Sequence, residues 1–363
     1  MPENAHSTLT IDQLQALPVQ VTSPADRSVW LELMQADRSS LLSQSPGWID
    51  CICASGSYQD ASRQYELPGG RRLVLPLVRR RGIPAPLSSY ASAPNSWGFG
   101  GLLSSSPLQP DDVAAVLADL ARQPFLRLSI RPNPLQALIW AKACPPGWRA
   151  QPRLAHVLDL QGGFNEVWSK RFTTKTRNKI HKAERSGVSV ECDESGRLVP
   201  DFYALFQRSI ERWAEQQHEP LALARWRARR RDPIDKFQTI TRELGTACKI
   251  WMAWVDSQPA AAILVLQDAN AHYTRGAMDI DLAGPTRANY LLQKLAIEAA
   301  CAAGCRHYHM GESGASDSLA HFKERFGAVP VSYAEYVIER LPITAMGAST
   351  RRLVKNIIGF KDA

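Results

Sequence analysis

The segment Phe164–Val190, FNEVWSKRFTTKTRNKIHKAERSGVSV, combines a dense run of basic residues with apolar residues at helical spacing. Trp168, Phe172 and Ile180 are placed so that a helix could keep one apolar side against a core. Within the basic run, Glu184 is the only residue of negative charge. The basic residues are Lys170, Arg171, Lys175, Arg177, Lys179, Lys182 and Arg185. A face that serves only solubility normally mixes charges of both signs four residues apart. The segment therefore predicts a helix that meets phosphate or another polyanion, with a plain solvated face as the alternative.

Residues 175–188 carry the pattern Lys-x-Arg-Asn-Lys-Ile-x-Lys-Ala-Glu-Arg-x-Gly-Val. This pattern resembles the helix-to-strand signature that opens the second half of Fem-like transferases. These are tandem-lobed relatives of the GNAT acyltransferases and include the acetyltransferase-like proteins of polysaccharide gene clusters. Further motifs follow that family's order and approximate spacing: Ser45-Pro46-x-Trp48, Leu75-Pro76-Leu77-Val78, Tyr273-Thr274-Arg275-Gly276-Ala277, Tyr290-Leu291-Leu292 and His321-Phe322-Lys323-x-x-Phe326-Gly327. The resemblance covers roughly residues 40 to 340.

The length and composition of the chain favour two compact lobes. It has 363 residues, of which 45% are hydrophobic, and can bury a large core. The resemblance implies an α/β fold class with mixed sheets, built as two tandem GNAT-like lobes of which the first is degenerate. We place the first lobe at residues 20–160, the second at 161–343 and a basic amphipathic tail at 344–363. The tail could dock on the protein itself or make a peripheral membrane contact.

The charge of the chain favours an anionic ligand. A total of 43 Lys and Arg against 35 Asp and Glu gives a net charge of +8 and a pI near 9.2. A nucleotide cofactor, a tRNA, a nucleotide sugar and an anionic membrane surface all fit this balance. The sequence shows no apolar stretch long enough for a transmembrane segment and no secretory apolar core near the N-terminus, so we expect a cytoplasmic protein. The seven cysteines fit a reducing compartment, and neither they nor the histidines have the spacing of a metal site.

The second lobe has the element order of a GNAT lobe. After the basic helix we predict a strand at 188–192 and a helix at 202–217. Strands at 248–255, 260–267 and 271–278 form a meander, because the residues that connect them favour turns. A helix at 287–303 then leads to a strand at 305–310, a helix at 317–326 and a last strand at 331–339.

The first lobe is expected to begin with helices at 28–42 and 46–54. A strand at 71–81 contains Pro76, which favours a sheet edge or a bulge. Residues 84–107 are rich in Gly, Ser and Pro and predict a long loop of the kind that often carries function. A helix at 111–123 and strands at 125–131 and 154–160 complete the lobe.

A cofactor site is expected where the helix at 287–303 begins. In a GNAT lobe the cofactor diphosphate rests on backbone N–H groups at this place, where orphan amides and the helix dipole attract anions. The candidates are Gly284, which allows close approach of the backbone, Thr286, which could cap the helix, Arg287, which adds charge, and Asn289. The resemblance implies acyl-coenzyme A as co-substrate, but the glycine-rich Arg/Gln-x-x-Gly-x-Gly/Ala signature is missing. A plain loop-to-helix junction is the alternative.

Acyl transfer to an amine needs a base, an oxyanion donor and an acid for the leaving group. Glu312 and Asp279 follow strands and are the favoured bases, ahead of Asp281 in its turn-like context. Tyr308 is a candidate proton donor, and so are Tyr273 and Tyr290.

Lys323 and two basic segments are the remaining candidates. The resemblance implies that Lys323 faces the cleft and meets phosphate or developing negative charge, whereas a surface ion pair with Glu324 is the alternative. Arg171, Lys175 and Lys179 are one helical turn apart and predict a phosphate-binding row that Lys323 approaches, with Arg177 turned toward the core. Arg225–Arg231 is expected to be a solvated linker, with phosphate or nucleic-acid binding as the alternative.

The resemblance implies an N-acyltransferase. It would move an acyl group from acyl-coenzyme A, or a related thioester, to an amine on a sugar or peptide precursor of envelope or polysaccharide synthesis. The substrate would be a small or nucleotide-linked molecule. One alternative is a peptidyl transferase of the same fold that uses aminoacyl-tRNA. Another is a non-catalytic nucleic-acid-binding protein, which would explain the charge but not the motif around Lys323.

Overall fold

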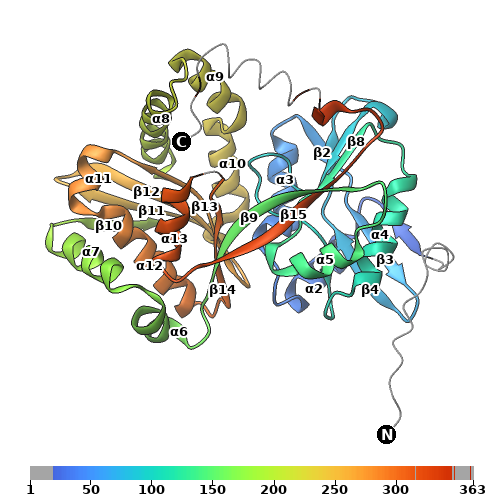
Figure 1. Cartoon of the computed structure of the whole chain (residues 1–363), viewed down its shortest axis with the longest axis horizontal. Helices are drawn as coiled ribbons and strands as arrows, with labels where there is room; N and C mark the ends of the chain where they lie inside the picture. The colour runs from blue at the N-terminus through green and yellow to red at the C-terminus, as the bar shows by residue number, and fades with distance from the viewer. Residues whose placement is uncertain (1–18, 315, 346, 348–359, 361–363) are drawn as a thin grey trace, which may run out of the picture.

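The computed structural model describes residues 19–314, 316–345, 347 and 360. Two lobes lie side by side, and the long strands β9 (Arg149–Asp159) and β15 (Val329–Glu339) run between them (Figure 1). Helices pack against mixed sheets in both lobes. The predicted α/β fold class with two lobes is confirmed.

The second lobe is built on four antiparallel strands, β10 (Ser189–Asp193), β11 (Cys248–Val255), β12 (Gln258–Gln267) and β13 (Ala271–Met278), followed by β14 (His307–Glu312), which is parallel to β13. Its helices are α6 (Gly163–Glu166), α7 (Thr174–Arg185), α8 (Val199–Gln216), α9 (Leu221–Arg231), α10 (Ile234–Leu244), α11 (Ile280–Thr286), α12 (Ala288–Ala302) and α13 (Asp317–Glu324). Strand β12 is buried over most of its length and contacts both α12 and α8. This explains its nearly continuous apolar sequence, which is typical of a central strand.

The first lobe continues the same sheet. Strands β8 (Arg127–Ile130), β6 (Ser89–Ala91), β5 (Val78–Arg80) and β2 (Tyr58–Asp60) extend it, so that the full order is β10-β11-β12-β13-β14-β9-β15-β8-β6-β5-β2. A separate sheet contains β1 (Gln20–Thr22), β3 (Arg63–Leu67), β4 (Arg71–Leu75) and β7 (Leu103–Ser104). The helices are α2 (Arg27–Ala36), α3 (Pro46–Ala54), α4 (Pro110–Arg122) and α5 (Ala137–Ala143).

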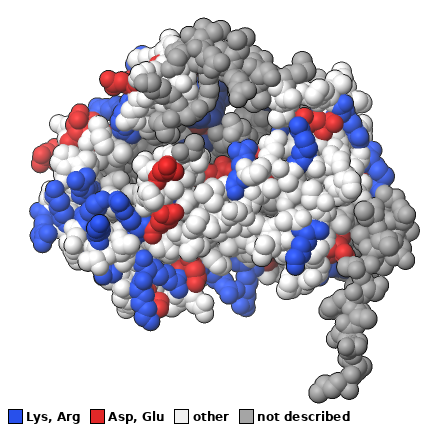
Figure 2. Space-filling model, in the orientation of Figure 1, with Lys and Arg blue, Asp and Glu red and all other residues white. Residues whose placement is uncertain are grey.

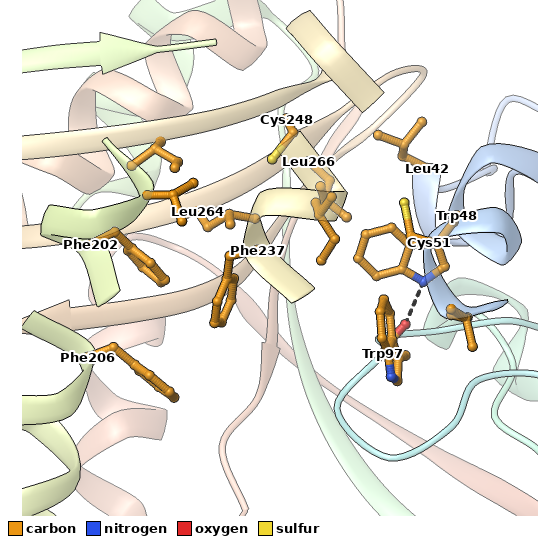
Figure 3. Packing of buried hydrophobic residues seen from close by; sticks show 14 of the residues in the cluster. Leu42, Trp48, Cys51, Trp97, Phe202, Phe206, Phe237, Cys248, Leu264 and Leu266 are labelled. Atoms are coloured by element: carbon orange, nitrogen blue, oxygen red, sulfur yellow. Dashed lines mark hydrogen bonds between the residues drawn. The ribbon is translucent and has the colours of Figure 1, made fainter. Parts of the chain in front are cut away.

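One hydrophobic cluster extends across the two lobes. Trp48 and Trp97 from the first lobe belong to the same cluster as Phe202, Phe206 and Phe237 from α8 and α10 (Figure 3). The Trp48 indole N–H donates a hydrogen bond of 2.9 Å to the Trp97 carbonyl oxygen, and the two rings meet edge to face with centroids 5.4 Å apart. Because buried aromatic side chains contribute much of the packing energy, this cluster holds the lobes together.

Strand β15 forms a second connection between the lobes. Residues Val329–Val337 pair with β9, and Tyr336–Glu339 pair with β8 of the first lobe. Glu335 and Glu339 on this strand form ion pairs with arginines of the neighbouring strands β8 and β9 and of the residue that follows β8, namely Arg127, Arg131, Arg149 and Arg153. The chain therefore returns to the first lobe after it has built the second.

Strands β13 and β14 separate soon after they begin to pair. Their parallel register consists of two pairs, Ala271 with Tyr308 and His272 with His309. A register shift opposite Leu264 and Val265 leaves Thr274 as an extra residue in β13 just beyond this point. A bulge bends a strand and increases its twist. The two strands therefore diverge and leave an opening in the sheet.

Several predictions about local structure were wrong. The basic segment 164–190 is not one helix, because a π-helical turn at Val167–Arg171 ends at Phe172 and α7 begins after the capping residue Thr173. Residues Arg225–Arg231 are part of helix α9 and not a linker. Asp281, expected to be in a turn-like context, lies in α11, which was not predicted. Helix α5 and strands β1, β2 and β3 were not predicted. Strands β6 and β7 lie within residues 84–107, which were predicted as a loop. The strand predicted at 71–81 is divided into β4 and β5, which belong to different sheets.

Two further predictions concern membranes. The tail predicted at residues 344–363 lies outside the described residues, apart from 344, 345, 347 and 360. Within the part of the chain that the structure describes, no helix combines the length and the apolar character needed to cross a bilayer.

Candidate functional site

A cleft of about 550 Å³ occupies the opening between β13 and β14. Residues Tyr273–Gly276 of β13 line one side, and Met310–Gly314 at the end of β14 line the other. The first lobe contributes the loop around Phe99, and α13 contributes Lys323. The cleft is therefore shaped by both lobes.

Lys323 points from α13 into this cleft and is 1% exposed. Its Nζ donates hydrogen bonds to the carbonyl oxygens of Gly311 at 3.0 Å and Glu312 at 2.8 Å. Phe322 and Phe326 anchor the helix by packing on Tyr290, with ring centroids 5.1 and 5.6 Å away. Burial lowers the pKa of Lys323 to about 7, although the nearby Glu312 carboxylate acts in the opposite direction. The lysine is thus poised to take up or release a proton near neutral pH.

Glu312 lies beside Lys323 and is held by Tyr333. The Tyr333 hydroxyl donates a hydrogen bond of 2.5 Å to Glu312 Oε1. Burial and the Glu312 carboxylate raise the pKa of Tyr333 far above its usual range, so the phenol stays protonated. Arg131, the residue that follows β8, lines the same cleft and pairs with Glu335 at 3.2 Å. This arrangement places a carboxylate, an amine and a guanidinium around one space.

Asp232, between α9 and α10, gathers three cations at the edge of the cleft. Its carboxylate is fully buried and lies 2.8 Å from Lys236 Nζ and 2.9 Å from both Arg275 and Arg231. Burial alone would raise the pKa of Asp232, but Arg275, Lys236 and Arg231 hold it well below its usual value. Burial also lowers the pKa of Lys236 to about 8, with Asp232 opposing the shift and Arg275 adding to it.

The Asp232 cluster also contacts a loop of the first lobe. Lys236 Nζ and Arg275 donate hydrogen bonds of 2.8 and 2.9 Å to the Ser96 carbonyl oxygen. Lys236 Nζ lies 4.1 Å from the centroid of the Trp97 ring, a cation–π contact. Ser96 has a φ of 69°, which is costly for a residue other than glycine. The two charged donors offset this cost and fix the loop at the cleft.

A second cavity of about 570 Å³ adjoins the cleft. The two share Asn95, Arg231 and Lys236 as lining residues. Five cationic side chains line this basic cavity: Arg80, Arg227, Arg230, Arg231 and Lys236. Among the described residues that line it there is no carboxylate. The cavity is therefore suited to an anionic group.

Aromatic residues accompany the cations of the basic cavity. Arg230 lies over the ring of Trp226 with its Cζ 5.0 Å from the centroid, and Arg80 lies over Tyr58 at 4.5 Å. Trp226 is 54% exposed, so one face of its ring is accessible. Stacking on such a face is a common way to hold a planar group, including a nucleobase.

The structure brings two of the predicted catalytic residues together and separates the other two from them. Glu312 and Lys323 line the cleft. Asp279 instead caps α11 through the Asp281 N–H and pairs with Arg208 at 2.6 Å. Tyr308 is fully buried in the core, where its hydroxyl donates a hydrogen bond to Gln293. Neither Asp279 nor Tyr308 lines the cleft, so we no longer assign them a role there.

The residues predicted to bind the cofactor lie at the junction of α11 and α12. Gly284 is inside α11, next to the Ile280 side chain, and the Thr286 hydroxyl donates to the Leu282 carbonyl oxygen. The expected role of Thr286 as the cap of α12 is therefore wrong, because its hydroxyl bonds within α11. Arg287 adopts a left-handed conformation, with φ 61°, between the two helices, and Asn289 follows it in α12. A diphosphate site at this junction stays a prediction.

The predicted phosphate-binding row does not form as one line. Arg171 precedes α7, pairs with Asp159 at 3.2 Å and donates to the Gln161 carbonyl oxygen. Lys175 is exposed, whereas Lys179 Nζ donates a hydrogen bond of 2.9 Å to the Tyr290 hydroxyl. Basic side chains gather over α7 on the outer face of the molecule (Figure 2). The row and Lys323 therefore face different spaces, and the basic cavity is the better candidate for a phosphate.

Sequence reasoning missed the role of Asp232 and Lys236. A signal was present, since Asp232 directly follows the Arg225–Arg231 block and Arg275 belongs to the Tyr273–Ala277 motif. Asp232 and Lys236 are four residues apart and pair locally, but the approach of Arg275 on β13 depends on the tertiary fold, which the sequence does not reveal. Within the described residues, no group of three or more His, Cys, Asp or Glu could hold a metal ion.

Gly276 and Tyr273 provide a steric test of the cleft wall. A Cβ atom at position 276 would overlap the Tyr273 hydroxyl, so we expect Gly276→Ala to displace the tyrosine. The free energy of unfolding should fall by about 1–3 kcal/mol, the usual cost of overpacking. Urea denaturation measures the change. Gly284→Ala is the control, since its Cβ would lie 3.7 Å from Ile280 in a helix. Equal stability of the two variants would contradict the prediction.

Comparison with known proteins gives one matching family model, for residues of the second lobe, and several solved structures with a similar fold. Residues 170–324 match a family model described as an acetyltransferase (GNAT) domain. The crystal structure of FemX resembles the chain with a TM-score of 0.63 at 12% identity, over 88% of this chain and 96% of FemX. A C-terminal domain (DUF2156) assigned to a lysylphosphatidylglycerol synthetase of Agrobacterium fabrum has a TM-score of 0.51 at 13% identity, over 91% of this chain and 98% of that one.

A third solved structure has a similar fold. A conserved protein of unknown function from Bacteroides thetaiotaomicron has a TM-score of 0.52 at 10% identity, over 88% of this chain and 98% of that one. At such low identity these likenesses show the fold. No curated protein sequence matches the chain.

Proposed function

Because residues 170–324 form a GNAT domain within a Fem-like, two-lobed fold, we propose that the protein is an acyltransferase that acylates an amine in the cleft between β13 and β14. We infer that the acyl donor is acyl-coenzyme A or a related thioester. The acceptor is a small molecule that carries phosphate, such as a nucleotide-linked sugar or peptide precursor of the envelope. The observation that carries the proposal is the buried Lys323 beside Glu312 in the opening of the sheet.

Lys323 has the geometry of a proton acceptor. A neutral lysine has two N–H groups, and the carbonyl oxygens of Gly311 and Glu312 accept two hydrogen bonds from Nζ. The lone pair is then directed away from these carbonyls. Lys323 removes a proton from the acceptor ammonium, and the free amine attacks the acyl carbon. The new C–N bond forms as the bond to the leaving group breaks, and the protonated lysine gives its proton to the leaving thiolate. The lysine, neutral again, then takes the second proton from the acylated nitrogen and releases it to solvent.

The basic cavity holds the phosphate of the acceptor. It adjoins the cleft through Asn95, Arg231 and Lys236, so an anionic group bound there could extend its amine toward Lys323. Arginine forms strong paired hydrogen bonds with phosphate oxygens. The exposed Trp226 offers a stacking surface for a base. This assignment replaces the row of cations on α7.

A second candidate keeps the fold and uses aminoacyl-tRNA as the acyl donor. The exposed cations of α7 and the basic residues of α9 favour it, because a tRNA needs an extended positive surface. Titration of the protein with acetyl-coenzyme A, free coenzyme A and charged tRNA separates the two. We expect saturable binding of acetyl-coenzyme A and release of a free thiol when an amine acceptor is present. Binding of tRNA alone would favour the second candidate and overturn the first.

The basic cavity can be tested with arginines that have no carboxylate partner among the described residues. Arg80 and Arg230 contact aromatic rings, so replacing them leaves no buried carboxylate unpaired. We expect the double variant Arg80→Gln/Arg230→Gln to lose roughly 1.5–3 kcal/mol of binding free energy for each lost phosphate contact. Calorimetry with inorganic pyrophosphate and with UDP, at two salt concentrations, measures the loss.

The control for this experiment is Arg225→Gln. Arg225 is on the same helix, pairs with Glu211 at 2.6 Å and does not line the cavity. Its replacement should leave the affinity for both ligands within about twofold, since exposed ion pairs contribute little. Equal binding by the double variant and the parent would show that the phosphate lies elsewhere.

A further inference from the structure

His272 lies at the closed end of the cleft. It is on β13, and its pairing with His309 on β14 is the last before the two strands diverge. The residue lines the cleft although it is 4% exposed. A group bound deep in the cleft would therefore meet the His272 imidazole.

The imidazoles at this end of the cleft have unpaired nitrogens. Within the described part of the chain, Nδ1 of His272 and both ring nitrogens of the fully buried His309 have no hydrogen-bond partner. The two ring centroids are 6.2 Å apart. Nearly all buried polar groups in native proteins are paired with protein, water or ligand, because an unpaired one destabilises the fold. A polar atom that completes the pairing of His272 is therefore expected in the cleft.

The first lobe holds the His272 ring in place. Phe99 stacks on it with centroids 5.1 Å apart and an angle of 29° between the planes. At Gly98, which has a φ of 80°, a Cβ would lie 3.3 Å from His272 Cε1, so glycine suits this close approach. An imidazole fixed from both sides can orient a ligand without first losing its own freedom.

The charges around His272 restrict the kind of group it can bind. Burial lowers the pKa of His272 to about 3, and Arg275 and Lys323 act in the same direction, so the ring is neutral. A neutral imidazole has one N–H donor and one acceptor nitrogen. The Arg275 cation also disfavours an ammonium group at this point. A hydroxyl or an amide, which both donates and accepts, matches the site.

We propose that His272 binds a hydroxyl or amide group of the substrate at the closed end of the cleft. The inference rests on the proposed function, because it takes the cleft as the place where the reactants bind. It adds a specificity-determining residue that lies apart from the groups that move protons.

The melting temperature of the unliganded protein gives the first test. His272→Phe keeps a planar ring and removes both nitrogens, and His272→Leu is a smaller replacement in case the ring of phenylalanine does not fit against Gly98. We expect at least one variant to melt above the parent, because an apolar group replaces an unpaired polar one. His181→Phe, at an exposed histidine of α7, is the control. If both variants melt at or below the temperature of the parent, the imidazole is satisfied by the fold and the inference is overturned.

Ligand binding gives the second test. Calorimetry uses acetyl-coenzyme A and UDP-N-acetylglucosamine, which both carry amide and hydroxyl groups. We expect the more stable of the two variants, His272→Phe or His272→Leu, to bind one of these ligands at least tenfold more weakly than the parent does. His272→Gln, which keeps an amide donor and acceptor, should retain most of the affinity. Equal binding of both ligands by the parent and by the apolar variant, His272→Phe or His272→Leu, overturns the inference.

The two tests separate the inference from the proposed function. If neither ligand binds to the parent, acyl transfer from coenzyme A in this cleft is contradicted. The melting temperatures then decide the role of His272 by themselves, since they need no ligand.

Discussion

Lys323→Met is expected to lower kcat/KM by roughly 100- to 10,000-fold, the usual contribution of a positioned proton-transfer group. Methionine keeps the length and the apolar stem of lysine but cannot take a proton. The carbonyl oxygens of Gly311 and Glu312 lose their lysine donor, which should cost about 1–3 kcal/mol of stability. This is less than the typical stability of a domain, so the variant should fold. Thiol release from acetyl-coenzyme A in the presence of an amine acceptor measures the activity.

The dependence on pH gives the same prediction a second readout. The parent's kcat/KM should rise with pH through the Lys323 pKa of about 7, because the neutral amine is the active form, and Lys323→Met should lack this step. The free energy of unfolding should also depend on pH through the pKa of Lys323. The pKa of Lys323 lies below the usual 10.5, so the unfolded chain binds more protons between pH 7 and 10.5. The free energy of unfolding of the parent should therefore rise with pH relative to Lys323→Met in this window.

Two controls make the result specific to Lys323. Lys294→Met changes a lysine of α12 that pairs with Glu298 at 2.8 Å and does not line the cleft, so activity should not change. Glu312→Gln removes the neighbouring carboxylate and should keep the pH step, although at a lower pKa, because Glu312 favours the charged lysine. A Lys323→Met variant with the parent's rate and pH profile would exclude the lysine from the reaction.

The meander of the second lobe could be predicted because its turns are local. Asp256 and Ser257 both have positive φ between β11 and β12, and the sequence at this point favours a tight turn. Lys323 could be singled out because the motif His321-Phe322-Lys323-x-x-Phe326-Gly327 resembles the family pattern, and the motif is short. Phe322 and Phe326 are one helical turn apart and both pack on Tyr290. In both places the information lies within a few residues.

Long-range packing explains the errors. Helix α9 was missed because its buried residues are the small Ala224 and Ala228, which give no apolar periodicity. The row from Arg171 to Lys179 assumed an unbroken helix, whereas Thr173 caps a new one by accepting a hydrogen bond from the Thr176 N–H. The Asp232 cluster joins the local residues Arg231, Asp232 and Lys236 to Arg275, which is distant in the chain. Only the tertiary fold brings Arg275 of β13 and the loop of Ser96 to this segment.

Asp232→Ala is expected to destabilise the protein by roughly 3–5 kcal/mol, the usual cost of removing one partner from a buried ion pair. The change leaves Lys236, Arg275 and Arg231 without the buried carboxylate that they share. The three cations would then repel one another, and the buried Lys236 cannot regain water. The Ser96 carbonyl oxygen would remain as an acceptor for two of them. Urea denaturation of the parent and the variant at pH 7 measures the difference.

Acid offers a check on the cause, because the charge of Asp232 should account for most of the effect. Its pKa lies below the usual 3.8 in the folded protein. The stabilisation is thus present above pH 4 and is lost as the pH falls through the folded pKa, so the difference between parent and variant should shrink in acid. Asp235→Asn, at an exposed aspartate in the first turn of α10, should change stability by less than about 0.5 kcal/mol. If Asp232→Ala lowers the free energy of unfolding no more than this control does, the three cations do not need the carboxylate. The loop of Ser96 would then need another explanation for its strained conformation at the edge of the cleft.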